Sequence, residues 1–186
     1  MHPPSYTGQM LAIVAQDEVL SQLGEVVCAS QSGLGLLSPF ALRQALEVRL
    51  DGTTPANRDL EAAPALVIWA FSAGCVGAAA LAAHWQRHRG SVLALCMVDG
   101  WGVPRDPGVP TYRLSHDSFT HHTSRCLGAG DTDFYAEPAV PHLTLWRQPQ
   151  SAMGWAVEEG RQERLSAANF LCQRSRAAIH RYSIRR

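Results

Sequence analysis

A serine at position 72 has the sequence surroundings of a nucleophile. The segment Ala70-Phe71-Ser72-Ala73-Gly74 ends an apolar run and opens an alanine-rich stretch, so Ser72 lies between an expected strand and an expected helix. A sharp strand-to-helix turn strains the serine backbone and brings neighbouring segments close, which favours small flanking residues. A serine in such a turn can attack an acyl carbonyl if a base accepts its proton. The alternative is a buried serine that only caps the following helix.

Two aspartates are candidates for the carboxylate that a serine nucleophile requires behind its base. Asp99 directly follows the expected strand Ser91 to Val98, and Asp117 lies just after the expected strand Thr111 to Leu114. Both positions are at the sheet edge where Ser72 must lie, because parallel strands end at the same edge. Either aspartate could instead cap a loop.

The base is harder to place, and His121 is the preferred candidate. It follows Asp117 and the expected strand before it, together with His122, at the correct edge of the sheet. His142 is expected at the start of a strand over Leu143 to Arg147. Five residues at about 3.3 Å each would leave it about 16 Å from the edge that holds Ser72 if that strand is parallel.

The segment around Ser72 resembles the nucleophile elbow of the α/β-hydrolase superfamily, G-x-S-x-G, with Ala70 in place of the first glycine. The resemblance implies an order of Ser, Asp or Glu, then His along the chain, and it slightly favours Asp117 as the acid. It also implies that an oxyanion is held by the backbone N–H of Ala73 and by one from an earlier loop, at Gln16 or Asp17.

The phrases Asp99-Gly100-Trp101-Gly102 and Ser115-His116-Asp117-Ser118-Phe119-Thr120-His121 also resemble those of small bacterial hydrolase-like proteins. This likeness covers about the middle third of the chain and indicates no particular substrate. No histidine lies between Gln148 and Ile179, where the superfamily's base would follow the last expected strand.

Aromatic side chains could frame the serine, Trp101 and Phe119 above all, and would form an apolar acyl or alkyl pocket. They are equally good core residues.

The cluster His116, Asp117, His121 and His122 could in principle hold zinc. Because it matches no established metal motif, we predict no metal and no cofactor.

The expected architecture is an α/β fold: a three-layer, mostly parallel sheet flanked by helices, in one domain over residues 1–186. Strands are expected at Met10 to Gln16, Glu25 to Ser30 and Ala65 to Phe71, besides those already named. Helices are expected from Pro39 to about Asp51, from Ala73 to Arg89 and from Leu165 to Tyr182, and an irregular segment from Ser115 to Pro141.

Composition excludes several classes of function. All sixteen basic residues of the 186 are arginines, which excludes chemistry that needs a lysine, and a formal net charge of zero argues against a nucleic-acid partner. Five scattered cysteines without a CxxC pair indicate a reducing compartment, so a cytoplasmic location is expected. The uncharged stretch from Ala63 to Ala83 reads as a strand and a helix rather than a membrane span.

The sequence therefore favours a serine hydrolase of a small acyl substrate, an ester or thioester, with Ser72, His121 and either Asp117 or Asp99. The alternative is a catalytically inactive protein of the same fold that binds a hydrophobic ligand or a protein partner. A metal-dependent hydrolase is a third, weaker hypothesis. The sequence leaves the oligomeric state open.

Overall fold

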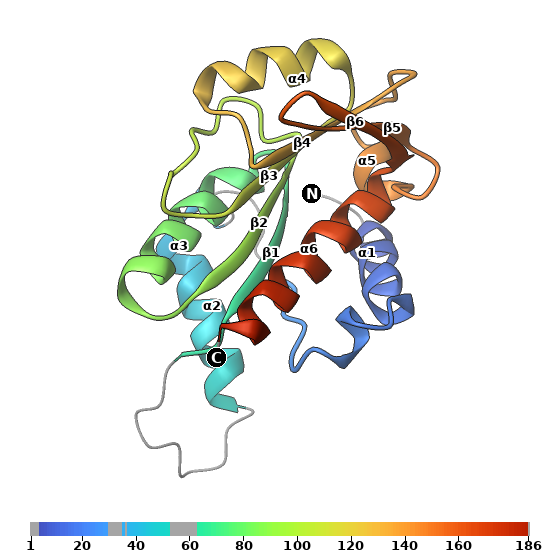
Figure 1. Ribbon diagram of the computed structural model, residues 1–186. Coiled ribbons are helices and arrows are strands. Elements are labelled where there is room, and N and C mark those ends of the chain that lie inside the picture. Colours follow the sequence, from blue (N-terminus) through green and yellow to red (C-terminus); the bar gives the residue numbers. More distant parts are fainter. Residues whose placement is uncertain (1–3, 30–34, 36, 53–62, 186) are drawn as a thin grey trace.

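The apolar runs of the chain assemble into one six-stranded sheet in the computed structural model, which describes residues 4–29, 35, 37–52 and 63–185 (Figure 1). The strands lie in chain order: β1 (Leu66–Phe71), β2 (Val92–Val98), β3 (Thr111–Ser115), β4 (Thr132–Ala136), β5 (Met153–Glu158) and β6 (Arg161–Ser166). The first four are parallel to their neighbours, and β5 and β6 continue the sheet antiparallel. The expected α/β class with a mostly parallel sheet is confirmed.

Helices cover both faces of this sheet (Figure 1). Helices α2 (Pro39–Gly52) and α3 (Gly74–His88) lie on one side, and α1 (Pro4–Gln16) and α6 (Ala167–Ile184) on the other. The residues of β1 alternate between the two cores: Ile68 and Ala70 pack with the α2 and α3 side, whereas Trp69 and Phe71 pack with the other. Apolar side chains on both faces explain why β1 and β2 read as continuous apolar runs.

Four further short helices lie between these elements in the described chain. The 3-10 helix η1 (Leu20–Gln22) follows α1, and α4 (Ser118–Ser124) with η3 (Arg125–Leu127) connects β3 to β4. Helix α5 (Thr144–Arg147) lies between β4 and β5 and packs against α1.

Two expected strands are helices instead. Met10 to Gln16 belongs to α1, where Met10 and Ile13 are one turn apart and both buried. A run of six apolar residues fits either structure, and packing on the sheet decides for the helix. Leu143 to Arg147 forms α5 and its N-cap, with Leu145 fully buried in the core beside α1 and α6. Residues 25–29 of a third expected strand have no regular structure, and residue 30 lies outside the described residues.

The segment from Ser115 to Pro141 is more ordered than expected, because it contains α4, η3 and β4. The uncharged stretch from Ala63 to Ala83 is divided between β1 and α3, as the sequence predicts. Across the part of the chain that the structure describes, every helix is too short or too polar to cross a membrane.

Candidate active site

Ser72 occupies a strained turn between β1 and α3. Its φ of 53° lies in the left-handed region, which a residue with a Cβ rarely adopts. The backbone N–H of Ser72 still donates to the Val98 carbonyl at 2.8 Å, and its own carbonyl accepts from the N–H of Cys75 at 3.0 Å. The ladder to β2 and the first turn of α3 thus hold the strained residue, and Ser72 is only partly buried. Strain of this kind is characteristic of functional turns.

Asp99 occupies the equivalent position at the end of the neighbouring strand. Phe71 and Val98 are paired in the parallel register, so the residues that follow them lie side by side. Asp99 also has a positive φ, 51°, and its N–H donates to the Leu114 carbonyl at 2.7 Å. Its side chain is 1% exposed, which places a carboxylate in a nearly water-free position behind the serine.

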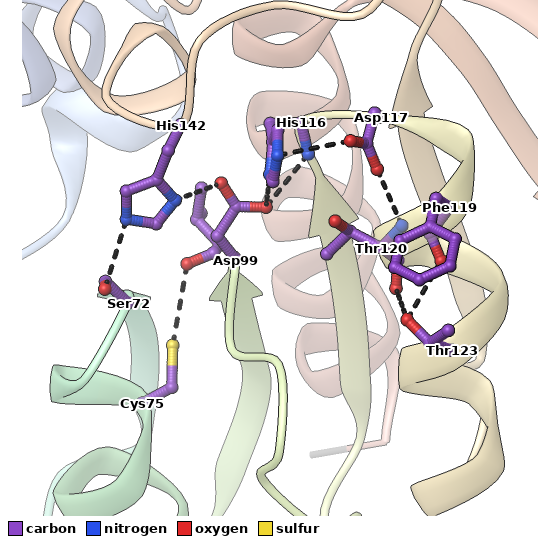
Figure 2. A network of polar contacts seen from close by, with 10 residues as sticks. Ser72, Cys75, Asp99, His116, Asp117, Phe119, Thr120, Thr123 and His142 are labelled. Atoms are coloured by element: carbon purple, nitrogen blue, oxygen red, sulfur yellow. Dashed lines mark hydrogen bonds and ion pairs between the residues drawn. The ribbon is translucent and has the colours of Figure 1, made fainter.

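His142 joins the two residues (Figure 2). Its Nε2 lies 3.2 Å from Ser72 Oγ, and its Nδ1 lies 2.7 Å from Asp99 Oδ2. The ring stacks on Phe71 with centroids 4.8 Å apart, and Phe71 is stacked in turn on Trp146. The imidazole side chain is 41% exposed, so a substrate can reach it from solvent.

This arrangement can activate the serine hydroxyl. A bond from Nδ1–H to Asp99 leaves the Nε2 lone pair facing Ser72, the tautomer that accepts the hydroxyl proton; the tautomer is assigned from these contacts. As His142 gains that proton, the buried carboxylate stabilises the imidazolium. The nearby thiol of Cys75 is no rival nucleophile, because burial and the charge of Asp99 raise its pKa to about 12.

The structure does not bring His121, the predicted base, to Ser72. His121 is 4% exposed and lies against Tyr135, with ring centroids 5.0 Å apart, and it does not line the cavity around Ser72. Successive residues of α4 point in directions about 100° apart, so Phe119 and Thr120 face the cavity while His121 faces β4. Burial, and secondarily the charge of His122, lowers the pKa of His121 to about 4.

Asp117, the slightly favoured acid, is the N-cap of α4 instead. Its Oδ1 accepts the backbone N–H of Thr120 at 2.6 Å, and its Oδ2 lies 3.3 Å from His116 Nε2. Burial raises the pKa of Asp117, but the Thr120 hydrogen bonds and the nearby His116 together outweigh it and lower the pKa. Of the two aspartates, the structure brings Asp99 to the histidine that contacts Ser72.

A cavity of about 420 Å³ opens beside Ser72. Trp101 and Phe119 line it, as the sequence predicts, together with Val76 and the buried Val103. The exposed fractions of Trp101 and Phe119 are 66% and 76%, so their rings are available to a ligand rather than being core residues.

The two expected oxyanion donors are separated. Ala73 is exposed and lines the cavity, next to Ser72. Gln16 is the last residue of α1 on the opposite face of the sheet and is not part of the cavity lining; Asp17 after it is paired with Arg176 of α6. The prediction for Gln16 depended on a strand that is a helix, so it fails with that strand.

A metal could be held by one group of side chains among the described residues. The group consists of Asp99, His116 and His142. Each of them offers one atom that could ligate a metal, and these three atoms all lie within 4.8 Å of one another. The nitrogens that face Asp99 are the same atoms that make its hydrogen bonds, so a metal there would replace the contacts behind Ser72. The cluster of His116, Asp117, His121 and His122 considered from the sequence does not converge.

The signal that would have identified His142 lies in β4, one of the strands that sequence reasoning missed. Residues 132–136, TDFYA, are rich in strand-forming types and are followed by Glu137-Pro138. As strand β4, parallel to β3, they carry the chain back to the edge of Ser72 and Asp99. The Val140 N–H then donates to the His116 carbonyl at 3.0 Å, which fixes the loop that presents His142.

Comparisons with models of protein families, with curated proteins and with solved structures found no match to this chain.

Proposed function

We propose that this protein is a serine hydrolase of carboxylic esters or thioesters. The observation that carries the proposal is the continuous set of contacts from Ser72 Oγ to His142 Nε2, 3.2 Å, and from His142 Nδ1 to Asp99 Oδ2, 2.7 Å. The order Ser72, Asp99, His142 along the chain is also the order that the resemblance to the α/β-hydrolase superfamily implies.

The proposed reaction has two stages. Ser72 Oγ attacks the acyl carbonyl while its proton passes to His142 Nε2, and the histidine then protonates the departing alkoxide or thiolate. Water, activated by the same nitrogen, next attacks the acyl-serine ester, which releases the acid and restores the hydroxyl. Asp99 keeps its charge and orients the ring throughout. The backbone N–H of Ala73 is the candidate donor to the oxyanion of both tetrahedral intermediates.

The cavity wall favours an apolar acyl group. Beyond the side chains that contact one another behind Ser72, the exposed side chains of the lining include Val76, Trp101 and Phe119, which are 47%, 66% and 76% exposed. No arginine or glutamate of the described chain lines the cavity, so no guanidinium faces the acyl group there.

A series of p-nitrophenyl esters from acetate to octanoate tests the proposal. We expect kcat/KM to rise with chain length as more apolar surface is buried, by up to about fourfold per methylene group, and Ser72→Ala to abolish turnover. A folded wild-type protein that hydrolyses no ester or thioester, or equal rates for wild type and Ser72→Ala, would contradict it.

The inactive binding protein is the alternative that the sequence raised, because no histidine follows the last expected strand. The position of His142 after β4, with its Nε2 3.2 Å from Ser72 Oγ, supports the hydrolase over that alternative. Metal-dependent hydrolysis is favoured by one observation, the convergence of Asp99, His116 and His142. The two reactions differ in their response to EDTA, which should leave a serine hydrolase unaffected and abolish metal-dependent turnover.

A further inference from the structure

The acid of the proposed triad has a second histidine beside it. We propose that His116 is a positioning residue that holds one oxygen of Asp99 in place, so that the other oxygen is directed at His142. This inference rests on the proposed function, since it assigns His116 a role in the same site.

The contacts of Asp99 divide cleanly between its two oxygens (Figure 2). Oδ2 faces His142 Nδ1 at 2.7 Å, whereas Oδ1 accepts the backbone N–H of His116 at 2.9 Å and lies 3.1 Å from His116 Nδ1. A carboxylate on its own can rotate about its last bond and exchange its oxygens. The tautomer of His116 that places its proton on Nδ1 is assigned from the carboxylate that this nitrogen faces. With it, two donors on Oδ1 oppose that rotation, and hydrogen bonds to a charged, buried acceptor are the strong ones.

The ring of His116 is itself held from its other side. Its Nε2 lies 3.3 Å from Asp117 Oδ2, and Asp117 caps α4 through its bond from the Thr120 N–H. Its edge also meets the ring of His142, with centroids 5.8 Å apart at 82°. The charged and titratable groups that face His116 are therefore Asp99, Asp117 and His142. A side chain with nitrogens at both ends of one rigid ring is what can connect the two carboxylates.

The position of His116 in the chain explains why one residue makes both bonds to Oδ1. It directly follows β3, whose Leu114 carbonyl already accepts the N–H of Asp99. The strand ladder thus places the backbone N–H of His116 opposite the carboxylate, and the same residue's Nδ1 reaches the same oxygen. His116→Ala keeps the backbone donor and removes only the ring, which makes the contribution of the ring measurable.

The test uses two substitutions at this position. His116→Ala removes the ring, whereas His116→Asn can place its Nδ2–H where Nδ1–H was, without the bond to Asp117. His122→Ala is the matched control, because His122 is an exposed histidine of α4 that does not line the cavity. For each protein we would measure the rate of labelling by a fluorophosphonate probe, the thermal unfolding midpoint, and the proton NMR signal of the Nδ1–H of His142.

We expect His116→Ala to label about ten- to a hundredfold more slowly, since misplacing a reacting group by about 1 Å can cost a hundredfold. His116→Asn should recover most of that loss, and His122→Ala should match wild type. A folded His116→Ala protein that labels at the wild-type rate would overturn the inference, and so would an Asn variant no faster than Ala.

Failure of the proposed function gives a different pattern. If wild type is not labelled at all, the NMR signal decides the inference alone. The Nδ1–H of His142 should then shift or exchange faster in His116→Ala and return toward its wild-type position in His116→Asn. An unchanged signal in His116→Ala would overturn the role of His116.

Discussion

Three side chains that follow three different strands meet at one edge of the sheet: Ser72 after β1, Asp99 after β2 and His142 in the loop after β4. Each of them has its own local support. Ser72 and Asp99 both have left-handed backbone geometry, held by hydrogen bonds to the next strand. His142 depends on the stack with Phe71 and on the bond to Asp99. A left-handed residue with a Cβ costs about 1–2 kcal/mol, and two such residues at adjacent strand ends locate the site independently of any motif.

Replacing the base distinguishes the two histidines. We expect His142→Ala to lower kcat for ester hydrolysis by at least about 10⁴-fold, because nothing else accepts the Ser72 proton. His121→Phe should keep its activity within about threefold of wild type, since it lies against Tyr135 and has no contact with the serine. Steady-state kinetics with one ester, on proteins of verified folding, compare the two. Loss of activity in His121→Phe alone would restore the sequence-based choice.

Replacing the acid separates Asp99 from Asp117. Asp99→Asn keeps the shape but favours the wrong tautomer of His142, so kcat should fall by about 10⁴-fold with KM little changed. Asp117→Ala removes a helix cap and should lower the free energy of unfolding by about 1 kcal/mol, with a much smaller effect on kcat. Kinetics and urea unfolding measure both. The assignment would be reversed if Asp117→Ala were the more damaging to kcat.

Close packing between elements also positions the site. The space around two glycines, Gly100 and Gly74, shows where that packing is tight and where it is not. A Cβ on Gly100 would lie 3.0 Å from both Cβ and Sγ of Cys75, so an alanine in the loop after β2 would have to displace α3 by a few tenths of an ångström. A Cβ on Gly74 would meet no atom of another element within 4 Å. The small residue two positions after Ser72, expected from the elbow pattern, is thus not required for space among the described residues.

Gly100→Ala should therefore displace Asp99 while Gly74→Ala should not. Overpacking costs about 1–3 kcal/mol of stability, and a shifted carboxylate should lower kcat by about tenfold or more. Gly74→Ala, at the start of α3, should be neutral or slightly stabilising and keep its kcat. Urea unfolding and ester kinetics on both variants provide the measurement. Equal behaviour of the two variants would contradict this account of the packing.

How well the sequence predicts each of these elements depends on how much of its apolar surface the element buries. The strands before Ser72 and Asp99 pack against helices on both faces, so their apolar runs and the alanine-rich α3 are unambiguous signals. The six-residue apolar run within Met10 to Gln16 has no distinctive period, so it does not separate a strand from a helix. At Leu143 to Arg147, packing overrides the strand preference of Leu-Thr-Leu-Trp. The expected position of His142 was therefore wrong as well, because that position depends on β4 and α5 rather than on any residue beside it.

At the scale of the whole molecule, a buried histidine makes stability depend on pH. Burial lowers the pKa of His121 from 6.5 to about 4, so the unfolded chain binds a proton at pH values where the folded protein does not. The free energy of unfolding should therefore fall as the pH drops from about 6.5 to about 4, by on the order of 2–3 kcal/mol. Above about pH 6.5, His121 is unprotonated in both the folded and the unfolded state, so none of this stability is lost.

Urea unfolding between pH 7 and pH 4.5 checks this dependence. His121→Phe should show a shallower loss of stability over that range, because it has no group to protonate. His122→Asn, at the exposed neighbouring position, should keep the wild-type slope. An identical slope in wild type and His121→Phe would show that other groups cause the acid sensitivity.

The central claim, that His142 activates Ser72, has one direct measurement: the intact mass of the folded protein after exposure to a fluorophosphonate. The account predicts a single adduct, located on Ser72 by peptide mapping, that is absent from Ser72→Ala, strongly reduced in His142→Ala and retained in His121→Phe. No adduct on folded wild type, or an adduct that persists in Ser72→Ala, would contradict it.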